Sequence, residues 1–132
     1  MRALVIDDSR TMRRIIAGIL RGVGYDIVEA GDGQEALDAM AAAAADGELF
    51  DLCCIDWNMP VMDGLTFVTK VREQRTWRGV TLMMVTTESE HGQIVRALAA
   101  GAHEYLIKPF TPDALKDKLE LLGLLPVQEE AL

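Results

Sequence analysis

The stretch Ala3-Leu4-Val5-Ile6-Asp7-Asp8-Ser9 joins a short apolar run to two carboxylates and to a serine that can cap a helix. An uninterrupted apolar run of this length is typical of a parallel strand that is buried on both faces. Four more short runs follow, each separated from the next by a helical pattern, at residues 26–30, 52–55, 80–85 and 104–107. Strands that alternate with helices predict a parallel sheet with right-handed crossovers. Five units favour an open, doubly wound α/β sandwich over a closed barrel, which needs eight.

The segments between these runs carry apolar residues at helical spacing, beginning with Met12, Ile15, Ile16, Ile19 and Leu20 after the cap at Ser9. The other four stripes are Ala36, Leu37, Met40, Ala41 and Ala44; Leu65, Phe67, Val68 and Val71; Ile94, Val95, Leu98 and Ala99; and Leu115, Leu119 and Leu122. Gly101 is a natural stop for the fourth helix. Thr111 and Pro112 are suited to the cap and first position of the fifth.

Length and charge narrow the class of protein further. The chain has 132 residues, half of them hydrophobic, and a formal net charge of −8, which indicates one globular domain and speaks against nucleic acid as the main partner. No apolar run approaches the length of a membrane helix, and Asp7 and Asp8 end the first run too early for a signal peptide. The adjacent Cys53 and Cys54 are read as small buried hydrophobes, which suits a cytoplasmic location. We expect a domain over residues 1–123 and a short tail over 124–132.

Polar residues follow four of the five predicted strands directly. They are Asp7-Asp8 after the first, Asp56 after the third, Thr86-Thr87 after the fourth and Lys108-Pro109 after the fifth. The second strand alternates apolar with acidic residues and is therefore placed at an edge. Ligands of open α/β sheets bind outside the carboxyl ends of the strands, so we expect these side chains to form one site.

The residue types at this edge predict chemistry with phosphate and magnesium. Three converging carboxylates raise each other's cost of ionisation, and a hard divalent cation such as Mg²⁺ offsets that cost best. No histidine and cysteine ligand set suggests zinc. Lys108 and Thr86 can bind a phosphoryl oxygen, and Asp56, with the acidic pair beside it, is the best candidate for a nucleophile that forms an aspartyl-phosphate.

Four motifs in order give the chain a resemblance to a known family: Val5-Ile6-Asp7-Asp8-Ser9, the stretch from Asp56 to Gly64 that reads DWNMPVMDG, Val85-Thr86-Thr87-Glu88, and Lys108-Pro109-Phe110. The sequence resembles the receiver domains of two-component response regulators, most closely the stand-alone regulators of chemotaxis, over about residues 2 to 122. The resemblance implies a flavodoxin-like five-stranded sheet in the order 2-1-3-4-5.

The resemblance also implies roles for the site residues. Asp56 would accept a phosphoryl group from a histidine kinase. Asp8 and Asp56 would bind Mg²⁺ directly together with the backbone carbonyl of Asn58, while Asp7 would act through a water molecule. Lys108 would pair with the phosphoryl group, and its bond to the following proline would be cis.

By the same resemblance, Thr86 and Tyr105 would form the switch: Thr86 moves toward the phosphoryl oxygen and Tyr105 turns inward. Asn58 and Glu88 lie where family members tune the rate of dephosphorylation. The surface formed by the fourth helix, fifth strand and fifth helix would bind a downstream protein, with the chain acting as a monomer that needs neither an organic cofactor nor a membrane.

Other functions remain open from the sequence. A phosphorelay shuttle would pass the phosphoryl group to a second histidine, and no residue distinguishes it from a chemotaxis regulator. An aspartate-nucleophile phosphatase commonly has a second acid two residues after the nucleophile, where this chain has Asn58. A flavin-binding module would need a glycine- and hydroxyl-rich loop after the first strand, where this chain has carboxylates. We therefore expect no enzymatic activity beyond the protein's own phosphorylation and dephosphorylation.

Overall fold

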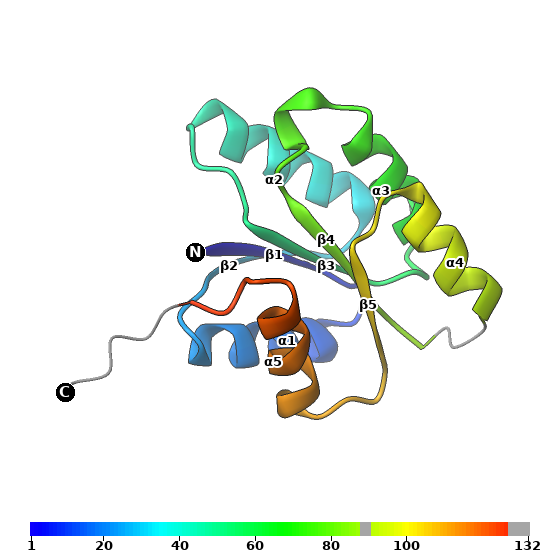
Figure 1. The fold of residues 1–132 in the computed structure, drawn as a ribbon. Coiled ribbons are helices and arrows are strands. Elements are labelled where there is room, and N and C mark those ends of the chain that lie inside the picture. Colours follow the sequence, from blue (N-terminus) through cyan, green and yellow to red (C-terminus); the bar gives the residue numbers. More distant parts are fainter. Residues whose placement is uncertain (88–90, 127–132) are drawn as a thin grey trace.

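The computed structural model describes residues 1–87 and 91–126, and its elements in chain order are β1 (Arg2–Ile6), α1 (Arg10–Gly22), β2 (Asp26–Ala30), α2 (Gly33–Ala45), β3 (Leu52–Ile55), α3 (Gly64–Arg72), the short 3₁₀ helix η1 (Arg75–Trp77), β4 (Thr81–Thr86), α4 (His91–Ala100), β5 (Glu104–Ile107) and α5 (Pro112–Leu121). All five strands pair in parallel, in the order β2-β1-β3-β4-β5 (Figure 1). The predicted doubly wound α/β fold and its strand order are confirmed, with β2 at an edge.

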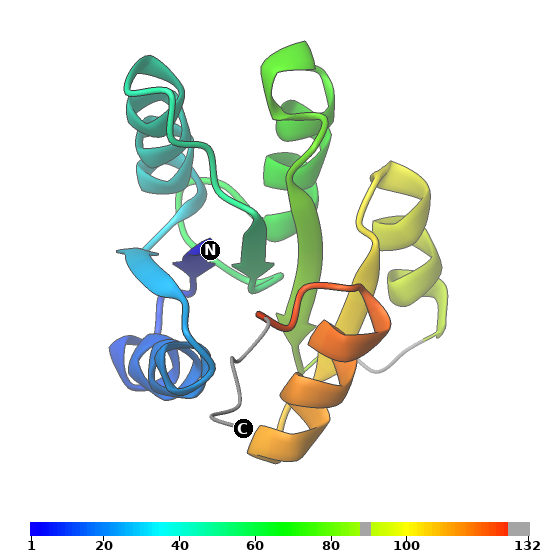
Figure 2. The ribbon, with the colours of Figure 1, turned by 60° about the vertical axis from the view of Figure 1, so that its left-hand side comes forward.

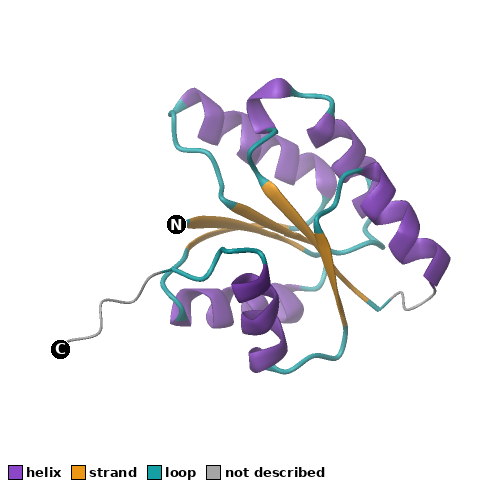
Figure 3. Cartoon of the chain, viewed as in Figure 1, coloured by secondary structure: helices purple, strands orange, loops and turns teal. Residues whose placement is uncertain are grey.

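The helices cover both faces of the sheet. Helices α1 and α5 lie on one face, and α2, α3 and α4 lie on the other (Figure 1 and Figure 2), while the strands form a single central layer (Figure 3). Successive strand residues enter different cores. Cys53 packs in the core under α2, α3 and α4, whereas Cys54 packs in the core under α1 and α5. Both thiols are free and buried, and burial raises the pKa of Cys54 to about 12, so they act as the apolar residues that the sequence predicted.

Side-chain caps fix where the helices begin. The side chain of Ser9 accepts a hydrogen bond from the backbone N–H of Met12, and Thr111 caps α5 in the same way, as predicted. Asp32 and Asp63 cap α2 and α3, which the sequence analysis did not identify. These caps set the directions in which the helices leave the carboxyl edge of the sheet.

Three apolar residues of the predicted helical stripes are exposed to solvent instead of buried. Ile15 on α1 and Val95 and Leu98 on α4 are 40–48% exposed, because the apolar stripe of each helix is wider than the face that the sheet covers. Two strands also differ by one residue from their predicted ranges. Strand β1 begins at Arg2, one residue earlier than predicted, and β4 runs from Thr81 to Thr86 instead of over residues 80–85.

The described part of the tail lies against the domain. The Tyr25 hydroxyl donates a hydrogen bond to the carbonyl of Leu124, and Leu124 packs against the core beneath α1 and α5. Residues 127–132 of the predicted tail lie outside the described residues. Among the residues that are described, no helix has both the length and the apolar character needed to cross a membrane.

Candidate functional site at the carboxyl edge of the sheet

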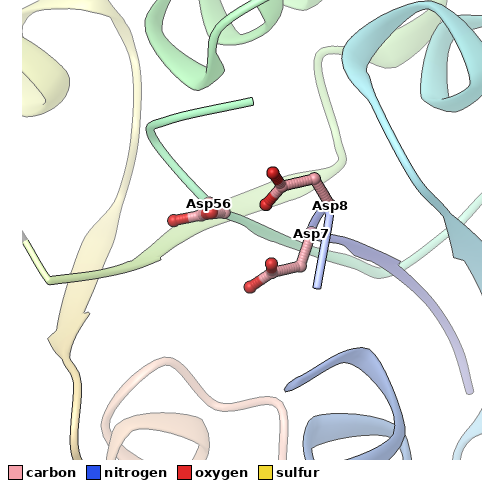
Figure 4. Close-up of side chains that lie close together, drawn as sticks. All are labelled: Asp7, Asp8 and Asp56. Carbon is pink, nitrogen blue, oxygen red and sulfur yellow. The ribbon is translucent and has the colours of Figure 1, made fainter. Parts of the chain in front are cut away.

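The parallel strands bring three aspartates together at one edge of the sheet. Asp7 and Asp8 follow β1, and Asp56 follows the neighbouring β3. Figure 4 shows the three side chains at the ends of these strands. One carboxylate oxygen from each lies within 4.8 Å of the others. Asp7 is 1% exposed and Asp56 is 9% exposed, whereas Asp8 is exposed, so the cluster is buried at its base and open to solvent on the side of Asp8.

Lys108 supplies the positive charge that the sequence predicted opposite these carboxylates. Its Nζ lies 2.7 Å from Oδ2 of Asp7 and 3.4 Å from Oδ1 of Asp56. The ammonium therefore joins the two more buried carboxylates, while Asp8 has no ion pair among the described residues. The Lys108–Pro109 peptide bond is cis, as expected from the resemblance.

The Asp56 carboxyl is hard to ionise in this setting. Its pKa is raised from 3.8 to about 6, chiefly because burial penalises the charged form. Lys108 opposes that rise, the nearby charge of Asp7 adds to it, and the hydrogen bond that the Trp57 backbone N–H donates to Oδ1 at 2.9 Å lowers it slightly. At neutral pH the carboxylate is still ionised and can act as a nucleophile.

The start of α1 holds Asp7 in place. The Ser9 backbone N–H donates to Oδ1 of Asp7 at 2.9 Å, and the guanidinium of Arg13 donates to the Asp7 carbonyl oxygen at 2.6 Å. Arg13 also pairs with Glu29 on β2 at 3.3 Å. The sequence analysis did not identify Arg13. Its spacing places it near the core side of the helix, but only the folded chain shows which carbonyl it reaches.

The loop between β3 and α3 is packed tightly against the site. The Gly64 backbone N–H donates to the carbonyl oxygen of Trp57 at 2.8 Å, and a Cβ at Gly64 would clash with the carbonyl oxygen of Asp56. At Gly33 a Cβ would lie 2.8 Å from the Met62 side chain. The sequence analysis did not identify these close approaches. Asn58 on this loop is exposed.

Thr86 and Tyr105 line a small cavity together with Trp57, the residue that follows Asp56. Thr86 is 3% exposed and Tyr105 is half-buried. The cavity has a volume of about 10 Å³, and Trp57, Met84 and Ile94 are among the residues that line it with them. That volume is sufficient for about one water molecule. The structure thus brings Asp7, Asp8, Asp56 and Lys108 together, with Thr86 and Tyr105 on the cavity that Trp57 also lines. Glu88, the second residue proposed to tune dephosphorylation, lies outside the described residues.

Residues 3–120 match the family model of the response regulator receiver domain. The chain belongs to this family. This receiver domain is 45% identical over 123 residues to the chemotaxis protein CheY1 of Helicobacter pylori, covering 92% of this chain and 96% of that protein. It is 40% identical over 121 residues to the chemotaxis protein CheY of Pseudomonas aeruginosa, covering 91% and 94%.

A solved structure shares the arrangement of the receiver domain. The chemotaxis protein CheY4 of Vibrio cholerae superposes with a TM-score of 0.80 at 37% identity, covering 91% of this chain and 96% of that chain. Because the matches extend over nearly the whole of each relative, the receiver domain is similar to complete CheY chemotaxis response regulators. It is thus homologous to response regulators of two-component systems.

Proposed function

We propose that this receiver domain accepts a phosphoryl group from a histidine kinase on Asp56. The observation that carries the proposal is the arrangement of Asp56 beside Asp7, Asp8 and Lys108. An oxygen of Asp56 attacks the phosphorus of a phosphohistidine. The new O–P bond forms as the P–N bond breaks, and the departing imidazole nitrogen keeps the electron pair and takes up a proton. Such a transfer depends mainly on positioning and on charge neutralisation, which these residues supply.

The donor set fits Mg²⁺. Oxygen atoms of Asp7, Asp8 and Asp56 lie close enough to share one ion, and Asp8 leaves the cluster open to solvent. We propose that Asp8 and Asp56 hold the ion directly with the carbonyl of Asn58, and that Asp7 contributes through water. Bound Mg²⁺ would neutralise carboxylate charge and polarise the phosphoryl oxygens.

Lys108 has a second part in the proposed reaction. In the structure its ammonium lies between Asp7 and Asp56. A phosphoryl group on Asp56 adds negative charge within reach of the same ammonium, so Lys108 can pair with it without leaving the site. We propose that the Thr86 hydroxyl, at the end of β4, donates to another phosphoryl oxygen.

We propose that phosphorylation is read out at the surface of α4, β5 and α5. Movement of Thr86 toward the phosphoryl group would vacate space beside Tyr105, which then turns inward. Val95 and Leu98 are large apolar side chains exposed on α4, three residues apart, and we propose that they contact the protein partner. The relatives are chemotaxis proteins, so we propose a downstream target in chemotaxis.

We propose no turnover of external substrates. The residue two positions after Asp56 is Asn58, which cannot supply the proton that a phosphomonoesterase gives to its leaving group. The chain's own phosphoryl group would be lost to water at a rate that Asn58 and Glu88 influence.

A small phosphodonor tests this function. Incubation with isotopically labelled acetyl phosphate and Mg²⁺ should label the wild-type protein once and leave the Asp56→Asn variant unlabelled. The matched control is Asp117→Asn, an exposed aspartate on α5, which should be labelled like the wild type. Equal labelling of the wild type and Asp56→Asn would refute Asp56 as the acceptor. Omission of Mg²⁺, or excess EDTA, should abolish labelling.

A further inference from the structure

The outer edge of β5 carries a contact that the proposed phosphorylation does not require. The Tyr105 backbone N–H donates a hydrogen bond to Oε1 of Glu104 at 2.9 Å. The same carboxylate oxygen lies 3.1 Å from Nζ of Lys118 on α5, and that Nζ lies 4.9 Å from the centre of the Tyr105 ring. One carboxylate therefore links the backbone of Tyr105 to an ammonium that lies over its ring.

This contact lies in a partly buried setting. The side chains of Lys118 and Glu104 are 27% and 16% exposed. A cation over the face of an aromatic ring is attracted to it, and partial removal from water strengthens the attraction. Glu104 orders Lys118 and satisfies the outward-facing N–H of an edge strand at the same time.

The Tyr105 side chain also lines the small cavity beside Thr86 and packs against the core under α2, α3 and α4. The volume of about 10 Å³ has room for roughly one water molecule, far less than a phenol ring needs. The ring can enter this space only if Thr86 or α4 moves. The observed position of Tyr105 is thus bounded by two features: the small space in the cavity and the ammonium of Lys118 over the ring.

We propose that Lys118, held by Glu104, is a positioning residue that retains Tyr105 in its observed position, which we take as the outward position of the proposed switch, and so sets how readily the switch operates. The inward position belongs to the proposed function, and the inference rests on it. When the ring turns inward it leaves the ammonium, and the attraction is lost. The charge of Lys118 therefore favours the resting state, and the outward-to-inward equilibrium depends on residues that touch neither phosphate nor metal.

The size of the effect follows from the strength of the contact. Cation–π contacts at exposed to partly buried sites correspond to about a two- to fivefold change in an equilibrium constant. Lys118→Met keeps the length and apolar stem of the side chain but removes the charge, so the inward fraction of Tyr105 should rise about two- to fivefold. Glu104→Gln keeps an acceptor for the Tyr105 N–H but loses the ion pair, and should shift the equilibrium in the same direction by less.

The two tyrosines of the chain make the experiment direct. Proteins labelled with ¹³C-tyrosine give one set of ring signals for Tyr105 and one for Tyr25, whose hydroxyl is bound to Leu124 and which serves as the internal reference. The Tyr105 side-chain couplings report its χ1 rotamer without phosphodonor, and acetyl phosphate with Mg²⁺ supplies the inward end point. Lys116→Met is the matched control, because Lys116 is exposed on the same helix.

The outcomes separate the two proposals. We expect a single χ1 rotamer in the wild type and in Lys116→Met, rotamer averaging in Lys118→Met, and recovery of the single rotamer in Lys118→Arg, which keeps the charge. If Lys118→Met has the couplings of Lys116→Met, the role of Lys118 is refuted. If Tyr105 in the wild type does not respond to acetyl phosphate and Mg²⁺ although Asp56 is labelled, the proposed switch is refuted, whatever the couplings of the variants show.

Discussion

The two ends of the sheet gather charged residues in opposite ways. At the carboxyl ends of the strands, three aspartates lie close together, two of them are paired with one ammonium, and the pKa of Asp56 is raised to about 6. At the amino ends, the guanidinium of Arg72 is surrounded by acceptors: it donates to the carbonyls of Gly101 and Val80 at 3.0 Å and meets Nδ1 of His103 at 3.1 Å. Like charges repel one another at the first end, whereas neutral hydrogen-bond acceptors surround a single guanidinium at the second.

This difference separates the parts of the fold that serve stability from those that serve the proposed chemistry. Hydrogen bonds around Arg72 tie the end of α3 to the segments that lead into β4 and β5. The three carboxylates have one ammonium within ion-pair distance among the described residues, and a site that carries excess negative charge is suited to a cation. Functional sites commonly depart from what stability alone would favour.

The largest expected effect is the loss of the one ammonium at the carboxyl end. Lys108→Met leaves Asp7 and Asp56 without their cation, and removal of one partner from a buried ion pair typically lowers the free energy of unfolding by about 4 kcal/mol. The pKa of Asp56 should rise further above 6, because Lys108 opposes its rise. Urea unfolding at pH 7.5 measures the first effect and ¹³C NMR of the Asp56 carboxyl the second. An unchanged midpoint would mean that Lys108 does not neutralise this cluster.

At the opposite end, Arg72→Met tests whether satisfied carbonyls stabilise the fold. The change leaves the carbonyls of Gly101 and Val80 without their donor, and unsatisfied buried acceptors should lower the free energy of unfolding by about 3 kcal/mol. Arg75→Met, at an exposed arginine of η1, is the control and should stay within about 0.5 kcal/mol of the wild type. Urea unfolding of the three proteins measures the difference; equal values for both variants would remove the contrast between the two ends.

The third expected effect is an increase in the free energy of unfolding, whereas the two preceding substitutions lower it. Because the folded-state pKa of Asp56 is raised, the folded protein binds more protons than the unfolded chain between pH 3.8 and about 6, and its stability falls as the pH rises through this window. Asp56→Asn should therefore raise the free energy of unfolding by about 2 kcal/mol at pH 7.5 in EDTA. That gain should fall to a few tenths of a kcal/mol near pH 3.5, where the carboxyl is protonated in the folded state and mostly protonated in the unfolded chain. A destabilised variant at pH 7.5 would show that the Asp56 carboxylate is not in conflict with its surroundings.

The sequence predicted the fold and the site because both depend on local patterns. Five apolar runs gave the strands, and the polar residue that follows each run marked Asp7, Asp56 and Lys108 at one edge, since parallel strands end together. The strand order came from the resemblance, not from periodicity. Ion-pair partners could be predicted only as a group, because the distances from Lys108 to each carboxylate are set by the twist of the sheet.

Contacts between distant segments were not predictable. Arg72 looks like an ordinary basic residue in the last turn of a helix, and only the packing of α3 against α4 brings it to Gly101. The same holds for Lys118 and Tyr105, because helical spacing does not reveal which strand residue an α5 side chain meets. The exposed Val95 and Leu98 show a related limit. A stripe at helical spacing predicts an apolar face of a helix, but the fold decides how much of that face the sheet covers.

The smallest expected effect is the pH dependence of stability that His103 contributes at the amino ends of the strands, which is opposite in direction to that of Asp56. His103 accepts a hydrogen bond from the Leu82 backbone N–H at Nδ1, 3.1 Å away. Burial, and next the charge of Arg72, lower its pKa. The folded protein then binds fewer protons than the unfolded chain just below pH 6.5, so stability is lost as the pH falls, the reverse of the Asp56 contribution.

His103→Asn removes the pH-dependent contribution of His103 to stability, because the amide oxygen of asparagine is an acceptor that does not titrate near neutral pH. As His103 is exposed, solvent screens the interaction, and we expect only a few tenths of a kcal/mol. The wild type should lose that much more stability than His103→Asn between pH 7.5 and pH 5.5, measured as the difference between the two urea-unfolding curves. Parallel curves would mean that His103 binds protons equally in the folded and unfolded states, and that the amino end of the sheet contributes no pH dependence to set against Asp56.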